Sequence, residues 1–541
     1  MRRLVAFLCL LPALAAGQAP ITEAELQAHV RFLAHDLLEG RAPGSRGSQI
    51  ARLYLASMLA SWGYQGAGDR GSFEQKVPMV GIESHPPQLW EFTGPRGALQ
   101  LAFGEEFIAT SGVQESQAKL EDAELVFVGY GIQAPEFRWD DFKGADLLGK
   151  VLVFLNNDPD WDPNLFAGPT RLYYGRWSYK YEKAAELGAA GALIIHTTPS
   201  AGYPWAVVVN SWSGTQFELP AAGERRVQVK GWVTEKAASK LFALGGVDMA
   251  KAVEAAKSRA FRPIPLGVRT SLTLSNTLTQ VEGANVLGLL PGADAEKAKE
   301  VVVVSAHHDH LGVGRPDERG DTIYNGARDN AAGCAQVLAI ARALAQRGER
   351  PPRSILVAFV DGEESGLLGS AYLAAHPPVP PGRIAAVVNY DGGNIFGRTR
   401  DVAQIGRGKS SLDRILQEQA ARQGRMVVDD PFPDRGSYYR SDHFSLARIG
   451  VPGLYFKAGN DYLGKPPEWG KAQAEAWEAN HYHRPSDELT PDWDFSGMVE
   501  DAALGLACVL AIAQEPTLPS WLPGDEFAPA RAKALAGASK P

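Results

Sequence analysis

The segment VVVVSAHHDH at residues 301–310 gives the clearest indication of the fold of this 541-residue chain. It begins as an apolar run of strand length and ends in histidines and an aspartate. Similar apolar runs recur at residues 285–290, 355–360 and 385–389, and a helical pattern over residues 331–345 separates two of the runs. Apolar strands between helices are typical of a mainly parallel sheet covered on both faces. The sequence therefore predicts an α/β fold with a mixed, mainly parallel sheet flanked by helices.

Groups that can bind a metal come soon after three of these runs. His307, the adjacent pair Glu363 and Glu364, and Asp391 each follow the end of one run. In open α/β sheets, sites form beyond the carboxyl ends of the strands, so we expect these side chains to converge at one edge. A set of histidines and carboxylates without thiolates suits zinc, cobalt or manganese. The sequence thus predicts a metal site at this edge.

Two further features favour a pair of metals and a general base. Asp329 stands just before the helical pattern at residue 331, where backbone N–H groups can hold a carboxylate. Such an aspartate can give one oxygen to each of two metals, which share one water at a spacing of about 3.5–4 Å. Glu363 and Glu364 are neighbours, so their side chains point in different directions. One glutamate can then bind a metal while the other accepts a proton.

Composition and the chain's N-terminal residues bear on its partners and its destination. The formal net charge is −8 and no Lys/Arg run occurs, so nucleic acid is not an expected partner. Arg2 and Arg3 precede an apolar run at residues 4–14 and then small residues, as in a cleaved signal peptide. We expect a secreted or periplasmic protein without stable membrane insertion, because we expect no later segment to be long and apolar enough to span a membrane. Cys334 and Cys508 lie in apolar helical patterns and are expected to be buried free thiols, with one disulfide between them as the alternative.

Four motifs closely resemble those of the M28 metallopeptidases, the aminopeptidase Y type. They are AHHDHLG at 306–312, NGARDNAAG at 325–333, DGEESGLLGS at 361–370 and YHRPSD at 482–487. The motifs occur in the family's order, and the resemblance covers roughly residues 20–515. It implies a zinc-peptidase-like fold, and residues 119–275 resemble the β-rich protease-associated domain that some members carry as an insertion.

The resemblance implies two zinc ions per chain and gives each metal-binding residue a place. His307 would bind one zinc, with His483 as its second nitrogen ligand. Asp329 would bridge both zinc ions, and Glu364 and Asp391 would complete the second site.

The resemblance also assigns the groups around the metals. Glu363 would be the general base, and Asp309 would orient His307, as carboxylates commonly orient metal-binding imidazoles. Tyr482 would donate a hydrogen bond to the oxyanion. The peptide bond between Asp329 and Asn330 is often cis in this family.

One loop and three histidines outside the ligand set also bear on the expected site. The loop resembles the M28 family's loop near the first residue of the substrate, and it consists of Arg440, Ser441, Asp442 and His443. His308 and His310 flank the first motif and are not expected to be ligands, whereas His481 stays an alternative to His483.

The chain divides into five predicted segments. These are a signal peptide (1–19), the N-terminal part of the peptidase domain (20–118), the protease-associated-like insertion (119–275), the M28-type catalytic domain (276–515) and a loosely packed C-terminal tail (516–541).

The predicted function is hydrolysis of the N-terminal peptide bond of peptides with a free N-terminus, by an exported zinc-dependent aminopeptidase. Two alternatives share the fold: a glutaminyl cyclase-like or carboxypeptidase-like enzyme, and a non-catalytic receptor-like ectodomain that binds protein partners. The full set of five ligands and a base favours the two-metal hydrolase, while the specificity for N-termini rests on the resemblance.

Overall fold

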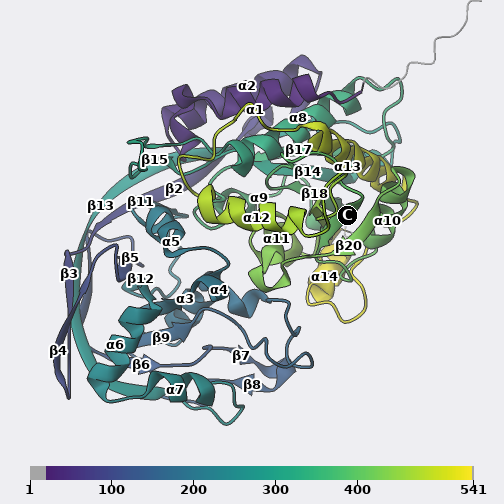
Figure 1. Cartoon of the computed structure of the whole chain (residues 1–541). Helices are drawn as coiled ribbons and strands as arrows, with labels where there is room; N and C mark the ends of the chain where they lie inside the picture. Colours follow the sequence, from purple (N-terminus) through teal and green to yellow (C-terminus); the bar gives the residue numbers. More distant parts are fainter. Residues whose placement is uncertain (1–19, 539–541) are drawn as a thin grey trace, which may run out of the picture.

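The computed structural model describes residues 20–538, so the predicted signal peptide lies outside the described residues. Two bodies are joined by a long ribbon of two strands (Figure 1). The main body contains a mixed sheet, confirming the predicted fold class. Its strands lie in the spatial order β1 (Gln65–Gly66), β13 (Ile264–Leu290), β17 (Ser354–Val360), β14 (Val301–His307), β18 (Ile384–Tyr390), β21 (Gly453–Ala458), β19 (Asp401–Ile405) and β20 (Met426–Asp429).

The four central strands β17, β14, β18 and β21 run parallel, so their carboxyl ends meet at one edge. Alternate residues of β14 face opposite layers, because side chains of a strand alternate between the two faces. Val302 and Val304 pack in the cluster that contains α8 (Ala332–Ala345) and α13 (Ser496–Gln514). Val301 and Val303 pack on the other face, with α9 (Leu368–Ala375) and α11 (His443–Arg448).

The N-terminal helices cover α8. Helix α1 (Glu23–Leu33) begins after Thr22, whose hydroxyl accepts from the backbone N–H of Glu25 at 3.2 Å. Helix α2 (Arg46–Ser61) begins after Ser45, whose side chain accepts from the N–H of Ser48. The main body also holds α10 (Leu412–Arg422) and α12 (Trp469–Asn480).

The second body is called the inserted body and comprises residues 89–274. Its strands are β3 (Leu89–Gly94), β4 (Gly97–Ala102), β5 (Phe107–Ser111), β6 (Gln117–Phe127), β9 (Val151–Leu155), β10 (Gly191–His196), β11 (Thr215–Glu218) and β12 (Val229–Thr234), with the N-terminal half of β13. Its helices are α3 (Trp177–Glu186), α4 (Thr198–Ala201), α5 (Trp205–Trp212), α6 (Glu235–Gly245) and α7 (Met249–Ala255).

This body begins near residue 89 and not at residue 119, where the sequence placed the boundary. Strand β5 pairs with β12, and Trp90 and Phe107 share one hydrophobic cluster with Val268. These strands bury their apolar faces against the insertion and not against the N-terminal helices. The resemblance of residues 119–275 to a protease-associated domain stays a prediction.

The ribbon consists of β2 (Glu74–His85) and β13. Twelve residue pairs join them antiparallel, from Glu74 opposite Val286 to His85 opposite Ser275. Strand β11 also pairs with β2, which ties the segment after α5 to the ribbon. Figure 1 shows β13 running from the main body to the far end of the inserted body.

Two sequence expectations need correction. The sequence led us to expect no membrane-spanning segment after the signal peptide, but helix α13 is long and apolar enough to cross a membrane. Of its 18-residue apolar stretch, 61% is buried inside the protein. The C-terminal residues pack firmly: α14 (Ala528–Ala538) follows Trp521, whose indole N–H donates to the carbonyl of Gly450 at 3.0 Å. The Arg531 guanidinium is buried and donates to the carbonyl of Ile384. Cys334 and Cys508 are buried free thiols, as predicted.

Candidate metal centre

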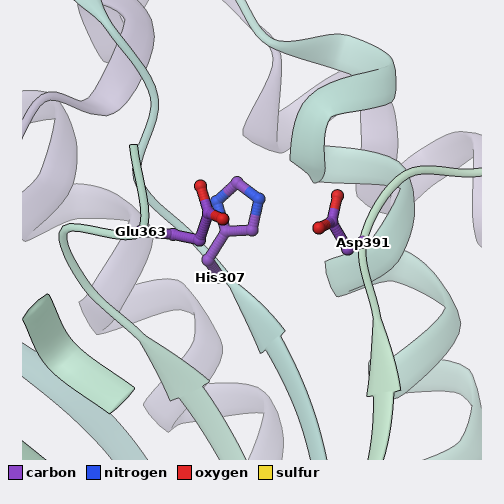
Figure 2. A group of neighbouring side chains, drawn as sticks. All are labelled: His307, Glu363 and Asp391. Carbon is purple, nitrogen blue, oxygen red and sulfur yellow. The ribbon is translucent and has the colours of Figure 1, made fainter. Parts of the chain in front are cut away.

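The predicted residues at the strand ends do meet. His307 is the last residue of β14, Glu363 lies in the turn after β17, and Asp391 directly follows β18. One ligand atom of each lies within 4.8 Å of the others. Figure 2 shows these side chains close together beyond the ends of neighbouring strands. The parallel register of the three strands thus creates the cluster.

Asp329 connects this cluster to His483. Its Oδ1 lies 3.2 Å from His307 Nε2, and its Oδ2 lies 3.6 Å from His483 Nε2. His483 Nε2 is also 2.9 Å from Glu364 Oε2. One carboxylate therefore presents a separate oxygen to each imidazole, which is the geometry of a bridging ligand.

The arrangement around Asp329 bears on the predicted pairing of the ligands. The resemblance implied that His307 and His483 bind one zinc. In the structure the two imidazoles face opposite oxygens of Asp329, His307 beside Asp391 and His483 beside Glu364. Ligand atoms of His307, Glu363 and Asp391 lie within 4.8 Å of one another, and so do those of His307, Asp329 and Glu364, while His483 lies closest to Glu364.

Asp309 holds the segment that carries both glutamates. Its Oδ1 accepts from the N–H of Glu363 at 3.0 Å, and its Oδ2 accepts from the N–H of Glu364 at 3.3 Å. Asp309 Oδ1 also lies 3.6 Å from His307 Nδ1, close to the predicted orienting position. A single buried carboxylate thus fixes both glutamates relative to His307.

The segment around Asp329 is held in the same manner by Asp487. The Asp487 carboxylate accepts from the N–H of Arg328 at 2.8 Å and from the N–H of Asp329 at 3.0 Å. The Asn330 amide donates to the carbonyl of Tyr390 and accepts from the N–H of Gly392, tying this segment to the end of β18. The peptide bond between Asp329 and Asn330 is cis, as the resemblance implied.

The residues fit divalent cations. The Nε2 atoms of His307 and His483 are buried and have no hydrogen-bond partner within residues 20–538, although a carboxylate oxygen lies close to each. Burial lowers the pKa of His483, but Glu364 and Asp329 outweigh it and raise the pKa to about 10, so the site attracts positive charge. Carboxylates buried this deeply need compensating cations. Imidazole and carboxylate donors without thiolates suit zinc.

His308, His310 and His481 each contact another group of the protein through one ring nitrogen. His310 Nδ1 lies 2.6 Å from Glu364 Oε1, so it holds a carboxylate that faces His483. His308 Nε2 bonds the carbonyl of Ala284, and His481 Nδ1 bonds the carbonyl of Ser486. No sequence signal identified the contact of His310, because it depends on the turn after β17, 54 residues away.

A cleft opens next to the cluster. Asp329, Glu363, Asp391, Tyr482 and Arg440 are among its lining residues. The Arg440 guanidinium donates to the Tyr482 hydroxyl oxygen at 3.1 Å, which leaves that hydroxyl's own proton free to donate.

The rest of the predicted substrate loop lies behind the cleft. Ser441 is fully buried, and its hydroxyl accepts from the Asn389 amide at 2.7 Å. His443 is also fully buried, between the rings of Tyr438 and Tyr455. Burial raises the pKa of Asp442, which is 2% exposed, to about 7. Arg440 is thus the residue of this loop that faces the cleft.

The inserted body also reaches the cluster, which the sequence analysis missed. Ser211 and Asn210 of α5 contact His483. These residues stand more than 270 positions from His483, and no local pattern indicates the contact.

Comparison with known proteins relates part of this chain to a peptidase family. Residues 285–507 match peptidase family M28. An aminopeptidase from Aneurinibacillus sp. strain AM-1 shares the fold, with a TM-score of 0.53 and 18% identity over 92% of this chain and 95% of that chain.

Two curated relatives match over shorter stretches. Leupeptin-inactivating enzyme 1 from Streptomyces exfoliatus is 26% identical over 220 residues, which span 40% of this chain and 45% of that protein. A "probable zinc metalloprotease" from Leptosphaeria maculans is 33% identical over 113 residues, which span 21% and 23%. The matches thus span less than half of these relatives' length. All five expected metal ligands lie within residues 285–507, the part of the chain that is similar to peptidase family M28.

Proposed function

We propose that this protein is an exported aminopeptidase that uses two zinc ions. The observation that carries the proposal is Asp329, whose two oxygens face His307 and His483 separately while Glu363 lies beside His307. Such a carboxylate suits a pair of cations about 3.5–4 Å apart. His307 and Asp391 would hold one zinc ion, and His483 and Glu364 the other.

Zinc supplies Lewis acidity at this site, polarising the scissile carbonyl and lowering the pKa of water. The protein's own groups do the rest. Glu363 accepts the proton of the attacking water and returns it to the leaving amine. Its position is fixed because Asp309 accepts from its backbone N–H. The Tyr482 hydroxyl, held by Arg440, donates to the developing oxyanion.

Replacing Glu363 by Gln tests the role of the base. The amide keeps the size of the side chain but cannot accept the proton, so we expect turnover of aminoacyl p-nitroanilides to fall by about 10²–10⁴-fold. Zinc content, measured by atomic emission, should stay at two per chain. Wild-type turnover in this variant would remove Glu363 from the mechanism, and one zinc in the wild type would favour a cyclase-type enzyme.

A blocked substrate tests the specificity for N-termini. The proposal predicts that a peptide with a free α-amine is cleaved and its N-acetylated form is not, as mass spectrometry of the products would show. The aminopeptidase from Aneurinibacillus, which shares the fold, and the cleft around Glu363 and Asp391 support this specificity. Efficient cleavage of the acetylated peptide would leave a hydrolase but exclude an aminopeptidase.

Export through a signal peptide at residues 1–19 is tested by the N-terminus of the mature protein. N-terminal sequencing of protein from the culture medium or periplasm should begin near residue 20.

A further inference from the structure

Helix α5 of the inserted body ends against a proposed metal ligand of the main body. The Ser211 hydroxyl lies 2.7 Å from His483 Nδ1. The adjacent Asn210 amide donates to the carbonyl of His483 at 3.1 Å. Both the ring and the backbone of this histidine are therefore held from the inserted body.

The backbone of His483 needs such support. Its φ of 54° lies in the left-handed region, which a residue with a Cβ adopts at a cost. A conformation of this kind persists where its surroundings fix it. The bond from Asn210 fixes the carbonyl of His483 itself.

The two candidate histidine ligands are supported from different bodies. His307 Nδ1 faces Asp309 of the main body, 3.3 Å from its carbonyl oxygen and 3.6 Å from its carboxylate. For His483 Nδ1, Ser211 is the hydrogen-bond partner within residues 20–538. Imidazoles that bind a metal through one nitrogen almost always donate the other N–H to an acceptor, which fixes the tautomer and the ring.

We infer that Ser211 is a positioning residue for His483, so that the inserted body completes the second metal position. The inference rests on the proposed two-zinc function. In the metal-bound protein the Ser211 oxygen would accept the Nδ1–H of His483, which leaves Nε2, 2.9 Å from Glu364 Oε2, to bind the metal. His307, at the other position, instead faces Asp309 of the main body through its Nδ1.

Other contacts hold α5 in place over this segment. The ring of Tyr203, just before α5, lies 6.4 Å from the ring of Tyr482 and under the guanidinium of Arg440. The backbone N–H of Arg171 donates to the carbonyl of Pro433 at 3.0 Å. The contact of Ser211 thus belongs to a docked surface, and affinity for the second metal reports on that docking.

The test is metal binding by Ser211→Ala. Metal-free protein is titrated with Co²⁺, followed by its visible absorption, and with zinc in competition with a chelator. We expect the affinity for one of the two metals to fall by about 10–100-fold, the usual effect of removing a partner of a metal-binding imidazole. Ser211→Thr keeps the hydroxyl and should restore the affinity. Ser213→Ala is the matched control, since that buried hydroxyl has no hydrogen-bond partner within residues 20–538.

A second background separates positioning from general damage. In His483→Gln, where this metal position is already lost, Ser211→Ala should not weaken the remaining metal. Unchanged metal affinity in Ser211→Ala would overturn the inference, and so would an equal loss in the His483→Gln background. If the wild type binds a single metal, the two-zinc proposal fails. The comparison of Ser211→Ala with the wild type then decides separately whether Ser211 supports that metal.

Discussion

At the scale of single residues, the candidate centre depends on carboxylates that bind backbone and not metal. Asp309 accepts from the N–H groups of Glu363 and Glu364, and Asp487 accepts from those of Arg328 and Asp329. Each carboxylate fixes a short segment from which ligands project. Ligand positions within a fraction of an ångström require such support.

Asp487→Asn tests this support. The amide replaces one acceptor by a donor that faces a backbone N–H, so the segment carrying Asp329 should shift. We expect zinc affinity to fall by about 10–100-fold with a parallel loss of kcat/KM. Dialysis against a graded chelator series measures the loss. Glu488→Gln, which affects only a surface ion pair with Arg319, is the control. Full zinc retention in Asp487→Asn would contradict this role.

The identities of the ligands could be predicted because the position of a residue after a strand determines the edge at which it lies. His307, Glu364 and Asp391 followed from that rule and the family motifs. The assignment of each histidine to a side of Asp329 could not be predicted, since it depends on side-chain direction and on a loop nearly 500 residues into the chain. The contacts of His310 and Ser211 are equally invisible, because they join distant segments.

At the scale of elements, α1 and α2 meet through a buried histidine. His29 is 5% exposed, and its Nδ1 lies 2.8 Å from the Tyr54 hydroxyl. Burial lowers the pKa of His29 from 6.5 to about 4, with Glu25 opposing the shift. The folded protein therefore keeps this imidazole neutral where an unfolded chain would protonate it.

This contact predicts acid sensitivity of the helix pair. Between pH 6.5 and about 4 the unfolded state binds more protons at His29 than the folded state does, so the free energy of unfolding falls as the pH drops. The shift corresponds to up to about 3 kcal/mol. His29→Gln cannot titrate and should show a smaller drop in Tm between pH 7 and pH 4.5 by calorimetry. His85→Gln, at an exposed position, should behave as the wild type does. Equal drops in all three proteins would exclude the contribution of His29.

At the scale of the whole molecule, two bodies share one ribbon (Figure 1). They also meet at the candidate metal centre, where Asn210 and Ser211 contact His483. The Arg171 side chain is buried at this junction, where it donates to the carbonyl of Ser200 and packs against Gly436 of the main body. The sequence indicated an inserted region but not this docking, because the boundary was set by local strand patterns while the junction is made by side chains far apart in the chain.

Arg171→Ala should loosen the junction without unfolding either body. We expect faster amide hydrogen exchange in residues 203–212 and 433–440, because the buried packing and hydrogen bond of the guanidinium are lost. Amides of β14 should exchange as in the wild type. Arg259→Ala is the matched control, because it removes two hydrogen bonds, to the carbonyls of Phe137 and Arg138, and a contact with the Trp139 ring, all within the inserted body. Unchanged exchange at the junction would show that Arg171 does not hold it.

The ribbon also limits where the protein can tolerate insertions and deletions. Each residue of an antiparallel strand advances about 3.4 Å, so losing one residue from both β2 and β13 would displace the inserted body by more than the length of a hydrogen bond. Because β11 pairs with β2, α5 would move with it. We therefore expect insertions and deletions among descendants of this sequence to accumulate in outlying turns, such as the one at Gly97, while the length of the ribbon is inherited unchanged.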